Sequence, residues 1–451
     1  MSRSRLAAIV LAAGEGTRMR SARPKVLHEI AGQPMIAHVL AALRPLDPVA
    51  TVVVIGGGME ALAAAVAPAL TAIQDPPRGT ADAVRAARPA LAEALAGDDI
   101  DDILVLYGDT PLLRTPTLAA LLETRRREPA AVVAVAGFRP ADPGPYGRLV
   151  QDRHGALARI VEAQDASAEE QAIGLCNGGI MALDASCAFV LLDRIGNDNS
   201  KREYYLTDIV ALADAEGRCC RAVELPAEEL LGVNTRAELA AAEALMQVRL
   251  RRRAIESGAT LVAPDTVFLA ADTRLGRDVV VEPNVVFGPG VTIADNARIR
   301  SFSHIEGATI GEGSIIGPFA RLRPGAVLEA DVHVGNFVEV KASRLGAGTK
   351  ASHLSYLGDS DIGAGTNIGA GTITCNYDGF NKWRTTIGER AFIGSHSALV
   401  APVTIGDDAY IATGSVVTSD VPPDALTIAR ARQIDKPRRA AELRARLKGK
   451  R

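Results

Sequence analysis

Continuous apolar runs alternate with helical segments over the first half of the chain. The apolar runs, each long enough for a buried strand, span residues 6–14, 49–58, 101–109 and 130–138. The segments between them with apolar residues at helical spacing span 34–46, 59–70 and 115–128. Buried strands joined by helices are typical of a mainly parallel sheet covered on both faces. We therefore predict a Rossmann-like α/β domain over residues 1–232, with its ligands at the carboxyl ends of the strands.

A long helix is predicted next, over residues 233–257, as a connector between two domains. Thr235 and Glu238 have the spacing of a capping box directly after Asn234. Gly258 is the residue type that commonly ends a helix.

Beyond this helix a large apolar residue recurs at every sixth position. The first run comprises Leu269, Leu275, Val281, Phe287, Ile293, Ile299 and Ile305. After a five-residue step come Ile310, Ile316, Leu322, Leu328, Val334 and Val340, and a last run holds Ile387, Ile393, Leu399, Ile405, Ile411 and Val417. Neither a helix nor an ordinary strand has this period, whereas a hexapeptide repeat does. We predict a parallel β-helix over residues 258–430, whose coils are stable only as a stack.

The repeat is interrupted once, over residues 374–386, by the segment TCNYDGFNKWRTT. This segment holds the only Trp of the chain, together with Asn, Tyr and Lys side chains. Loops extruded from solenoids are usually where binding occurs. A binding loop is therefore the favoured interpretation, and a harmless insertion is the alternative.

Composition excludes several classes of protein. A chain of 451 residues needs at least two domains, and its net charge of −3 argues against a general nucleic-acid binder. Residues 431–451 are basic and are expected to form a solvated tail. No segment approaches the roughly 18 apolar residues of a membrane helix, and the signal-like start fits a first strand better. The five cysteines show no CxxC spacing, which predicts reduced thiols in a cytoplasmic protein.

The glycine-rich stretch after the first strand predicts a phosphate-binding loop. Gly14 and Gly16 let the backbone approach a ligand closely, and Arg18 and Lys25 supply positive charge. We expect the helix after this loop to add its positive N-terminal end. The GKS/T of a Walker A motif is absent, so the pattern alone leaves the kind of phosphate open.

A series of motifs in a fixed order resembles one bacterial family over almost the whole chain. In the first half they are LAAGEGTRMRSARPK, RGTADA, YGDTPLL, YGRLV, IVEAQDA, CNGGIM, EYYLTD and GVNTRAEL. In the second half they are GPFARLRPGA, VGNFVEVKAS, ASHLSYLGD, NIGAGTITCNYDG and LVAPVTIG. The family is the bifunctional N-acetylglucosamine-1-phosphate uridylyltransferase/glucosamine-1-phosphate N-acetyltransferase. The resemblance also implies that the β-helix is left-handed.

For the uridylyltransferase, the resemblance implies a site for UTP and the N-acetylated sugar phosphate. The residues expected to hold the UTP phosphates are Leu11, Ala12, Ala13, Gly14, Arg18 and Lys25, with Arg18 and Lys25 acting catalytically. Those expected to read uracil are Gln74, Gly79 and Thr80, and those expected to bind the sugar are Gly147, Glu162 and Asn177. Tyr107 and Gly108 also belong to the implied site. Asp109 and Asn234 are the implied Mg²⁺ ligands, although on its own Asp109 reads equally well as a turn cap.

For the acetyltransferase, the resemblance implies that His353 is the general base, because an ammonium group cannot attack the thioester of acetyl-CoA. The residues implied for the phosphosugar are Arg323, Glu339, Lys341, Tyr356, Asn367 and Lys382. Those implied for acetyl-CoA are Ala370, Asn376, Tyr377, Ser395, Thr413 and Arg430. Since the outer faces of a β-helix are flat, a pocket there needs a neighbouring chain, and a homotrimer is expected.

The chain departs from the family pattern at a few positions of these motifs. Ala81 and Asp82 stand where Gly and His are usual, Gln164 replaces Lys, and Gly178 replaces Thr. Thr413 stands where Ala is frequent. These changes leave the shape of the base, sugar and CoA pockets open.

Three alternatives stay open at this stage. The β-helix could be only regulatory, as in ADP-glucose pyrophosphorylase-like proteins, or the chain could be a non-catalytic assembly subunit. The second half also holds His304, His333, His353 and His396. The third alternative is therefore a zinc hydratase of the γ-carbonic anhydrase type, a β-helix that binds zinc through three His. The favoured interpretation is a cytoplasmic enzyme that makes UDP-N-acetylglucosamine for peptidoglycan and lipopolysaccharide synthesis, with no nucleic-acid or membrane partner.

Overall fold

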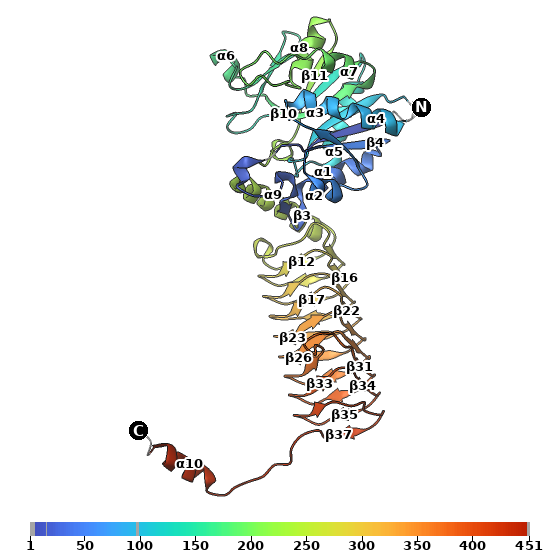
Figure 1. Ribbon diagram of the computed structural model, residues 1–451, viewed down its shortest axis with the longest axis vertical. Helices are drawn as coiled ribbons and strands as arrows, with labels where there is room; N and C mark the ends of the chain where they lie inside the picture. The colour runs from blue at the N-terminus through green and yellow to red at the C-terminus, as the bar shows by residue number, and fades with distance from the viewer. Residues whose placement is uncertain (1–4, 15, 96–98, 449–451) are drawn as a thin grey trace. The chain divides into compact units, whose positions relative to one another are not determined.

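A computed structural model describes residues 5–14, 16–95 and 99–448 (Figure 1). The chain divides into two compact units, residues 1–249 and residues 250–451. Each unit is described by itself below, with the labels of Figure 1.

The first unit is built on one large, mainly parallel sheet. Its strand order is β11-β7-β10-β6-β1-β4-β5, with β10 antiparallel to both of its neighbours and a β8–β9 hairpin paired to β10. The bounds are β1 Leu6–Leu11, β4 Ala50–Gly56, β5 Leu70–Gln74, β6 Asp102–Tyr107, β7 Val133–Phe138, β8 Arg148–Gln151, β9 Leu157–Val161, β10 Cys176–Asp184 and β11 Cys220–Glu224, with a small separate pair β2 Glu29–Ile30 and β3 Gln33–Pro34. The carboxyl ends of β1, β4, β5 and β6 therefore meet at one edge.

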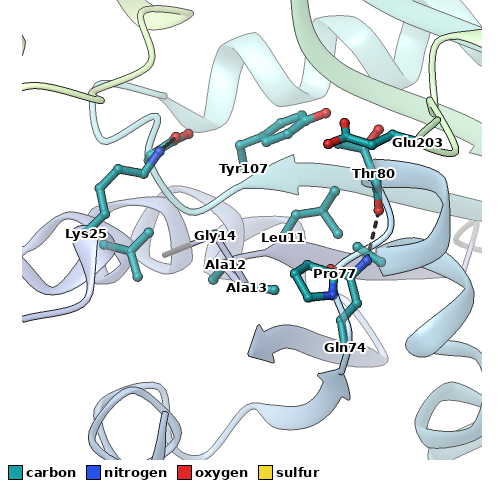
Figure 2. A pocket seen from close by; sticks show the side chains of 14 residues that line it. Leu11, Ala12, Ala13, Gly14, Lys25, Gln74, Pro77, Thr80, Tyr107 and Glu203 are labelled. Atoms are coloured by element: carbon teal, nitrogen blue, oxygen red, sulfur yellow. Dashed lines mark hydrogen bonds and ion pairs between the residues drawn. The ribbon is translucent and has the colours of Figure 1, made fainter. Parts of the chain in front are cut away.

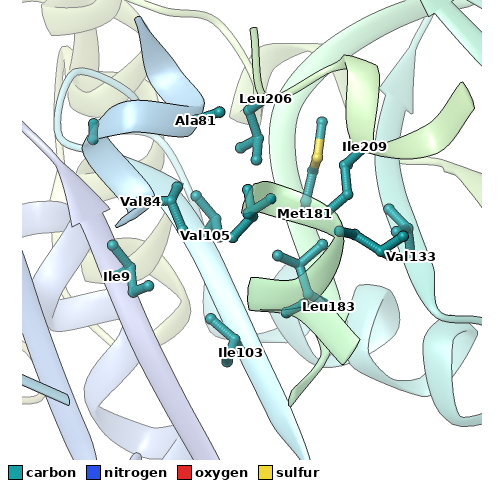
Figure 3. Close-up of a cluster of buried hydrophobic side chains, with 14 of the residues drawn as sticks. Ile9, Ala81, Val84, Ile103, Val105, Val133, Met181, Leu183, Leu206 and Ile209 are labelled. Atoms are coloured by element: carbon teal, nitrogen blue, oxygen red, sulfur yellow. The ribbon is translucent and has the colours of Figure 1, made fainter. Parts of the chain in front are cut away.

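Helices cover both faces of this sheet. They are α1 Met35–Leu43, α2 Glu60–Ala65, α3 Thr80–Ala86, α4 Arg88–Leu95, α5 Thr115–Arg126, α6 Ala168–Gln171, α7 Ala185–Asp193 and α8 Asp208–Ala215. Successive residues of a strand point to opposite faces, so Ile9 belongs to one apolar cluster and Val10 to the other. Figure 3 shows the first cluster, in which Val84 of α3 and Ile209 of α8 pack against strand residues such as Val105. The predicted α/β fold is confirmed.

The helix expected directly after the glycine-rich loop is absent from the described residues, and that expectation is wrong. The segment instead forms two short 3-10 turns, η1 Thr17–Met19 and η2 Lys25–Leu27, before α1 begins. Gly16 and Arg20 flank the first turn in the left-handed conformation, and Pro24 is extended. Backbone conformations of these kinds prevent a continuous helix, so no helix dipole supports this loop.

The connector is a continuous helix, α9 Arg236–Glu256. The capping box forms as predicted, because Glu238 N–H donates to Thr235 Oγ1 (3.2 Å) and Thr235 N–H donates to the Glu238 carboxylate (2.9 Å). Gly258 follows the helix with a φ of +101°. The boundary between the two units falls inside this helix.

The second unit is a stack of coils in which three parallel sheets run along its length (Figure 1). The first sheet comprises β12 Thr260–Leu261, β14 Val280–Val281, β17 Arg298–Ile299, β20 Ile315–Ile316, β23 His333–Asn336, β26 Lys350–His353, β29 Asn367–Ile368, β32 Phe392–Ile393, β35 Tyr410–Ile411 and β37 Leu426–Thr427. The second comprises β13 Arg274–Leu275, β16 Thr292–Ile293, β19 Ala308–Ile310, β22 Ala326–Leu328, β25 Arg344–Leu345, β28 Ser360–Ile362, β31 Thr385–Ile387 and β34 Val403–Ile405. The third comprises β15 Val286–Phe287, β18 His304–Ile305, β21 Arg321–Leu322, β24 Glu339–Lys341, β27 Tyr356–Gly358, β30 Ile373–Cys375, β33 Ala398–Val400 and β36 Val416–Val417.

The six-residue repeat lies inside the coils, as predicted. Its members are buried throughout except Leu275, which is half-buried. In-register pairs such as Ile299 with Ile316 and Ile316 with Val334 place aliphatic side chains of neighbouring coils directly above one another. Buried hydroxyls complete the interior at the corners, where Thr366 Oγ1 donates to the carbonyl of Gly388 (2.7 Å). The predicted β-helix is confirmed.

The interrupted repeat forms a loop between β30 and β31. Asn367 pairs with Phe392, a longer step than the usual one, such as Arg298 to Ile315. Asp378 organises the loop by accepting hydrogen bonds from the N–H groups of Phe380 (2.8 Å) and Asn381 (2.6 Å). These donors lower the pKa of Asp378 to about 2.

The last helix, α10 Arg439–Lys448, is exposed along its whole length. No helix among the described residues combines the length and the apolar character needed to cross a membrane.

Candidate active sites

A cavity of about 380 Å³ lies at the carboxyl edge of the first unit's sheet. Its lining comprises Leu11, Ala12, Ala13, Gly14, Lys25, Val26, Gln74, Pro77, Gly79, Thr80, Ala83, Tyr107, Asp109 and Glu203. Figure 2 shows Lys25 on one side of it and Thr80 and Glu203 on the other, with the β1 carboxyl end between them. Most of the residues implied for UTP are thus gathered around one space.

At the Lys25 side, three polar groups from distant parts of the chain converge. Lys25 Nζ forms an ion pair with the Asp109 carboxylate and donates to Asn234 Oδ1 at 2.8 Å. Gly16 lies against the Lys25 stem, because a Cβ there would be 2.5 Å from Lys25 Cβ. Asp109 and Asn234 therefore direct two oxygen atoms at one cationic group, and oxygen donors of this kind suit Mg²⁺.

At the other side, the segment that carries Gly79 and Thr80 is held rigidly. Gly79 has a φ of +116°, and a Cβ at this position would be 2.6 Å from the backbone oxygen of Tyr204. Thr80 Oγ1 accepts a hydrogen bond from the N–H of Leu206 (2.9 Å). Gln74, only 5% exposed, donates from Nε2 to the carbonyl oxygen of Gly79 (2.9 Å).

The three residues implied for the sugar lie outside the cavity lining. Gly147 and Asn177 are adjacent, since the N–H of Asn177 donates to the Gly147 carbonyl (2.8 Å). Glu162 follows β9 and accepts a hydrogen bond from Thr207 Oγ1 (3.2 Å). Burial raises the pKa of the Glu162 carboxyl group above its ordinary value. Arg18 also lies outside the lining, exposed on the first 3-10 turn.

Tyr107 and Gly108, the two implied residues at the end of β6, are also packed tightly against their neighbours. Burial raises the pKa of Tyr107, and a Cβ at Gly179 would be 2.8 Å from its ring. Gly108 is buried, where a Cβ would be 3.2 to 3.3 Å from Val26 and Ala12. Tyr107 is thereby fixed as the wall of the cavity.

In the second unit, charged side chains gather on the third sheet and the corner after it. Arg323 forms an ion pair with Glu339 (2.8 Å), which lies beside Tyr356 on the next coil. Lys341 contacts the Asp359 carboxylate (3.5 Å), and Asn376 Nδ2 hydrogen bonds with the same carboxylate. The stacked coils thus place these residues together.

Two lysines in this cluster lie close enough to repel one another. The hydrogen bond with Lys341, and then the positive charge of Lys341, lower the pKa of Lys382. A phosphate group would relieve this repulsion, which makes the cluster suited to an anionic ligand.

His353 ends β26 at the corner that precedes Tyr356. Its Nδ1 lies 2.7 Å from Asn336 Oδ1, on the preceding coil. An amide oxygen only accepts hydrogen bonds, so Nδ1 carries the proton and Nε2 is left as the basic nitrogen.

The residues implied for acetyl-CoA fall into two groups. Ala370, Ser395 and Thr413 follow one another on successive coils, where Gly369 and Gly394 allow the backbones to pack closely. Arg430 closes this row by donating to the Thr413 carbonyl (2.8 Å). Asn376 and Tyr377 instead begin the extruded loop, Tyr377 being exposed. Asn367 lies on the outer face of the first sheet beside Lys350.

Comparison with protein families matches both units. A MobA-like NTP transferase domain model matches residues 8–173. A bacterial transferase hexapeptide model matches residues 272–307, 307–342 and 384–419.

Curated relatives match nearly the whole chain. The bifunctional protein GlmU of Azorhizobium caulinodans is 55% identical over 452 residues, covering 99% of this chain and 98% of the relative. The bifunctional protein GlmU of Paramagnetospirillum magneticum is 53% identical over 437 residues, covering 96% of each. The chain belongs to the GlmU family. As a member it combines a uridylyltransferase and an acetyltransferase.

This membership resolves the alternatives left open above. The matches extend over both units, so neither a purely regulatory β-helix nor a non-catalytic subunit fits the GlmU family. Among the described residues, no group of three or more His, Cys, Asp and Glu side chains could hold a metal ion. The matches to GlmU proteins over nearly the whole chain, and not this absence, exclude a zinc hydratase.

Most of the residues that differ from the GlmU motifs make contacts with neighbouring residues in the structure. At Gly178 a Cβ would be 2.9 Å from the Ala136 carbonyl oxygen and 2.8 Å from Leu230, so a threonine would need this packing to shift. Gln164 donates to Tyr205 (3.2 Å), and the N–H of Ala81 donates to Tyr204 (2.9 Å). Two departures hydrogen bond with implied binding residues: Asp82 accepts from the Gln74 side chain, and the Thr413 carbonyl accepts from Arg430.

Several residues of the two sites were missed by sequence reasoning. Asn336 and Asp359 contact site residues from neighbouring coils, although both lie within or next to quoted motifs. Glu203 lines the first cavity and belongs to the EYYLTD motif, which was the available signal. Ala83 also lines it and ends the quoted RGTADA motif, whereas Val26 and Pro77 line it outside the quoted motifs.

Proposed function

We propose that this chain acetylates glucosamine-1-phosphate on its β-helix and then transfers UMP from UTP to the product, giving UDP-N-acetylglucosamine and pyrophosphate. We assign the transfer to residues 1–232, the acetylation to residues 258–430, the connector to 233–257 and a tail to 431–451. The convergence of Lys25, Asp109 and Asn234 beside a cavity is the observation that carries the first assignment. A cytoplasmic location is part of the proposal, in keeping with five unpaired cysteines.

In the first reaction site, the sugar phosphate oxygen attacks the α-phosphorus of UTP and pyrophosphate leaves. No protein nucleophile is required, so the chain contributes positioning and charge. Lys25 and Arg18 neutralise the phosphates, and the Gly14 backbone lets them approach. Asp109 and Asn234 would hold Mg²⁺, which when bound supplies further charge neutralisation at the phosphates.

In the second reaction site, the amine of glucosamine-1-phosphate attacks the thioester carbonyl of acetyl-CoA. His353 Nε2 takes the proton that the amine loses, and the C–S bond breaks as the amide forms. The proton then passes to the departing sulfur, which leaves as the CoA thiol. Arg323, Lys341 and Lys382 hold the sugar phosphate, which fixes the amine near His353.

The two assignments are tested by two assays on the same full-length chain. Wild type should release free thiol from acetyl-CoA with glucosamine-1-phosphate, and pyrophosphate from UTP with N-acetylglucosamine-1-phosphate. His353→Ala should lower thiol release by roughly 10²- to 10⁴-fold and leave pyrophosphate release unchanged. Lys25→Ala should do the reverse. A variant that abolishes both reactions, or a wild type lacking one of them, would contradict the assignment.

We also propose that the chain works as a homotrimer through its β-helix. Phe302, Phe319 and Phe337 stack along one corner with ring centroids 4.9 and 5.2 Å apart. They are 53%, 45% and 55% exposed, and Leu354 continues the row at 61%. A continuous apolar ridge of this length is the kind of surface that a second copy covers. Leu354 is the neighbour of His353, so a partner on this ridge would border the acetyltransferase site.

A further inference from the structure

Asp82, on the first turn of α3, contacts the residue proposed to read the base. Asp82 Oδ2 accepts a hydrogen bond from Gln74 Nε2 at 2.9 Å. The same nitrogen donates to the Gly79 carbonyl oxygen, also at 2.9 Å, the bond dashed in Figure 2. Gln74 lines the cavity and is only 5% exposed.

These two partners determine which way the Gln74 amide faces. A carbonyl and an ionised carboxylate both accept hydrogen bonds and donate none. Turning the amide over would place Oε1 against two oxygen atoms and remove the Gln74 donor from both, although the Gly79 carbonyl would keep the N–H of Ala83 (3.1 Å). The Gln74 amide is therefore locked with its NH₂ group toward Asp82 and Gly79, and Oε1 is the atom left for a ligand.

The neighbourhood of Asp82 keeps this lock in place. Arg78 forms an ion pair with Asp82 Oδ1 (3.2 Å), which leaves Oδ2 directed at Gln74. Backbone hydrogen bonds to Tyr204 hold the loop on both sides of Gly79, from Tyr204 N–H to Arg78 (2.8 Å) and from Ala81 N–H to Tyr204 (2.9 Å). These contacts hold both acceptors toward Gln74.

We propose that Asp82 is a positioning residue that makes the nucleotide site selective for uracil over cytosine. A fixed acceptor matches the N3–H donor of uracil and opposes the lone pair on N3 of cytosine. This inference rests on the proposed function, in which Gln74 faces the base. At this position the family pattern has His, whose ring can donate or accept a hydrogen bond. The acceptor-only carboxylate that fixes the Gln74 amide is therefore specific to this chain.

The test is the ratio of kcat/KM for UTP to kcat/KM for CTP in pyrophosphate release. Asp82→Asn offers an NH₂ donor to Gln74 and so permits the amide to turn over. The UTP:CTP ratio should fall roughly tenfold, through KM rather than kcat. Asp82→Glu retains a carboxylate and should keep the ratio within about threefold of wild type. The uracil analogue 5-methyl-UTP has the same N3–H, so its rate should follow that of UTP in every variant.

A matched control is Asp193→Asn, which removes another carboxylate paired with arginine, Arg88, in the same unit. It should leave the ratio unchanged. If Asp82→Asn lowers activity with UTP and CTP in equal proportion, or leaves the ratio as it was, the inference is wrong and Asp82 is only structural. A wild type that releases no pyrophosphate from UTP would instead overturn the proposed function itself. A misfolded Asp82→Asn is recognised by the loss of the first unit's melting transition. Asp82→Leu, which lacks any acceptor, then serves as the test variant.

Discussion

His353 relies on Asn336, a neighbour from the preceding coil, for the state of its ring. The contact between Nδ1 and the amide oxygen, at 2.7 Å, fixes the tautomer in which Nε2 is basic. The proposed base thus depends on a pair of residues that lie 17 positions apart in the chain and next to one another in the stack.

Asn336→Ala should lower the acetyltransferase kcat roughly tenfold with little change in KM, because substrate binding is retained while the base loses its orientation. Asn336→Asp keeps an acceptor and adds a negative charge that favours the protonated ring. The acid limb of its pH–rate profile should therefore move to higher pH. Steady-state thiol release across pH measures both effects. A KM change alone in Asn336→Ala would assign Asn336 to substrate binding instead.

Single residues also show how far the sequence could predict the sites. Motifs placed Lys25, Asp109 and Asn234 in one site, and the structure brings them into contact. Asn336 and Asp359 were not singled out, because a polar residue in a β-helix gains its role from whichever residue stacks above or below it. That register depends on coil lengths along the whole stack, which a local pattern does not report.

The secondary-structure elements whose apolar residues recur at a regular spacing were predicted well. The strands of the first sheet and the coils of the second unit follow patterns that repeat locally, so short windows of sequence reveal them. The segment after Gly14 was predicted wrongly as a helix. Its path depends on left-handed conformations at Gly16 and Arg20 and on the packing of Gly16 against Lys25, which hydrophobic periodicity does not encode.

The loop between β5 and α3 depends on one glycine. Gly79 combines a φ of 116° with a ψ of 174°, a conformation essentially restricted to glycine, and faces the Tyr204 backbone. Gly79→Ala should destabilise the first unit by about 1–3 kcal/mol and raise the KM for UTP, while thiol release stays intact. Gly155→Ala is the matched control, because Gly155 also has a positive φ, +84°, but no atom lies within 4 Å of its Cβ position. Equal losses in the two variants would show that steric contact with Tyr204 is unimportant.

For the whole molecule, the ridge of phenylalanines predicts how copies assemble. Phe337→Asp should place a charge in this exposed ridge and shift the proposed trimer toward smaller species, with loss of thiol release and preserved pyrophosphate release. Light scattering coupled to size exclusion gives the mass. Phe380→Asp is the control, since Phe380 is 92% exposed at the tip of the extruded loop. A Phe337→Asp protein with the wild-type mass would place the interface elsewhere.

The coil register described for the second unit also has a consequence for synthesis. Each coil pairs only with the coil before it and the coil after it, as Ile299 with Ile316 and Ile316 with Val334. A chain that leaves the ribosome from its N-terminus can therefore add one finished coil at a time, each new strand using the last as its template. The residues from Arg323 to Lys382 that we assign to the acetyltransferase belong to consecutive coils. This cluster is expected to be assembled within the monomer before the final coils have been translated.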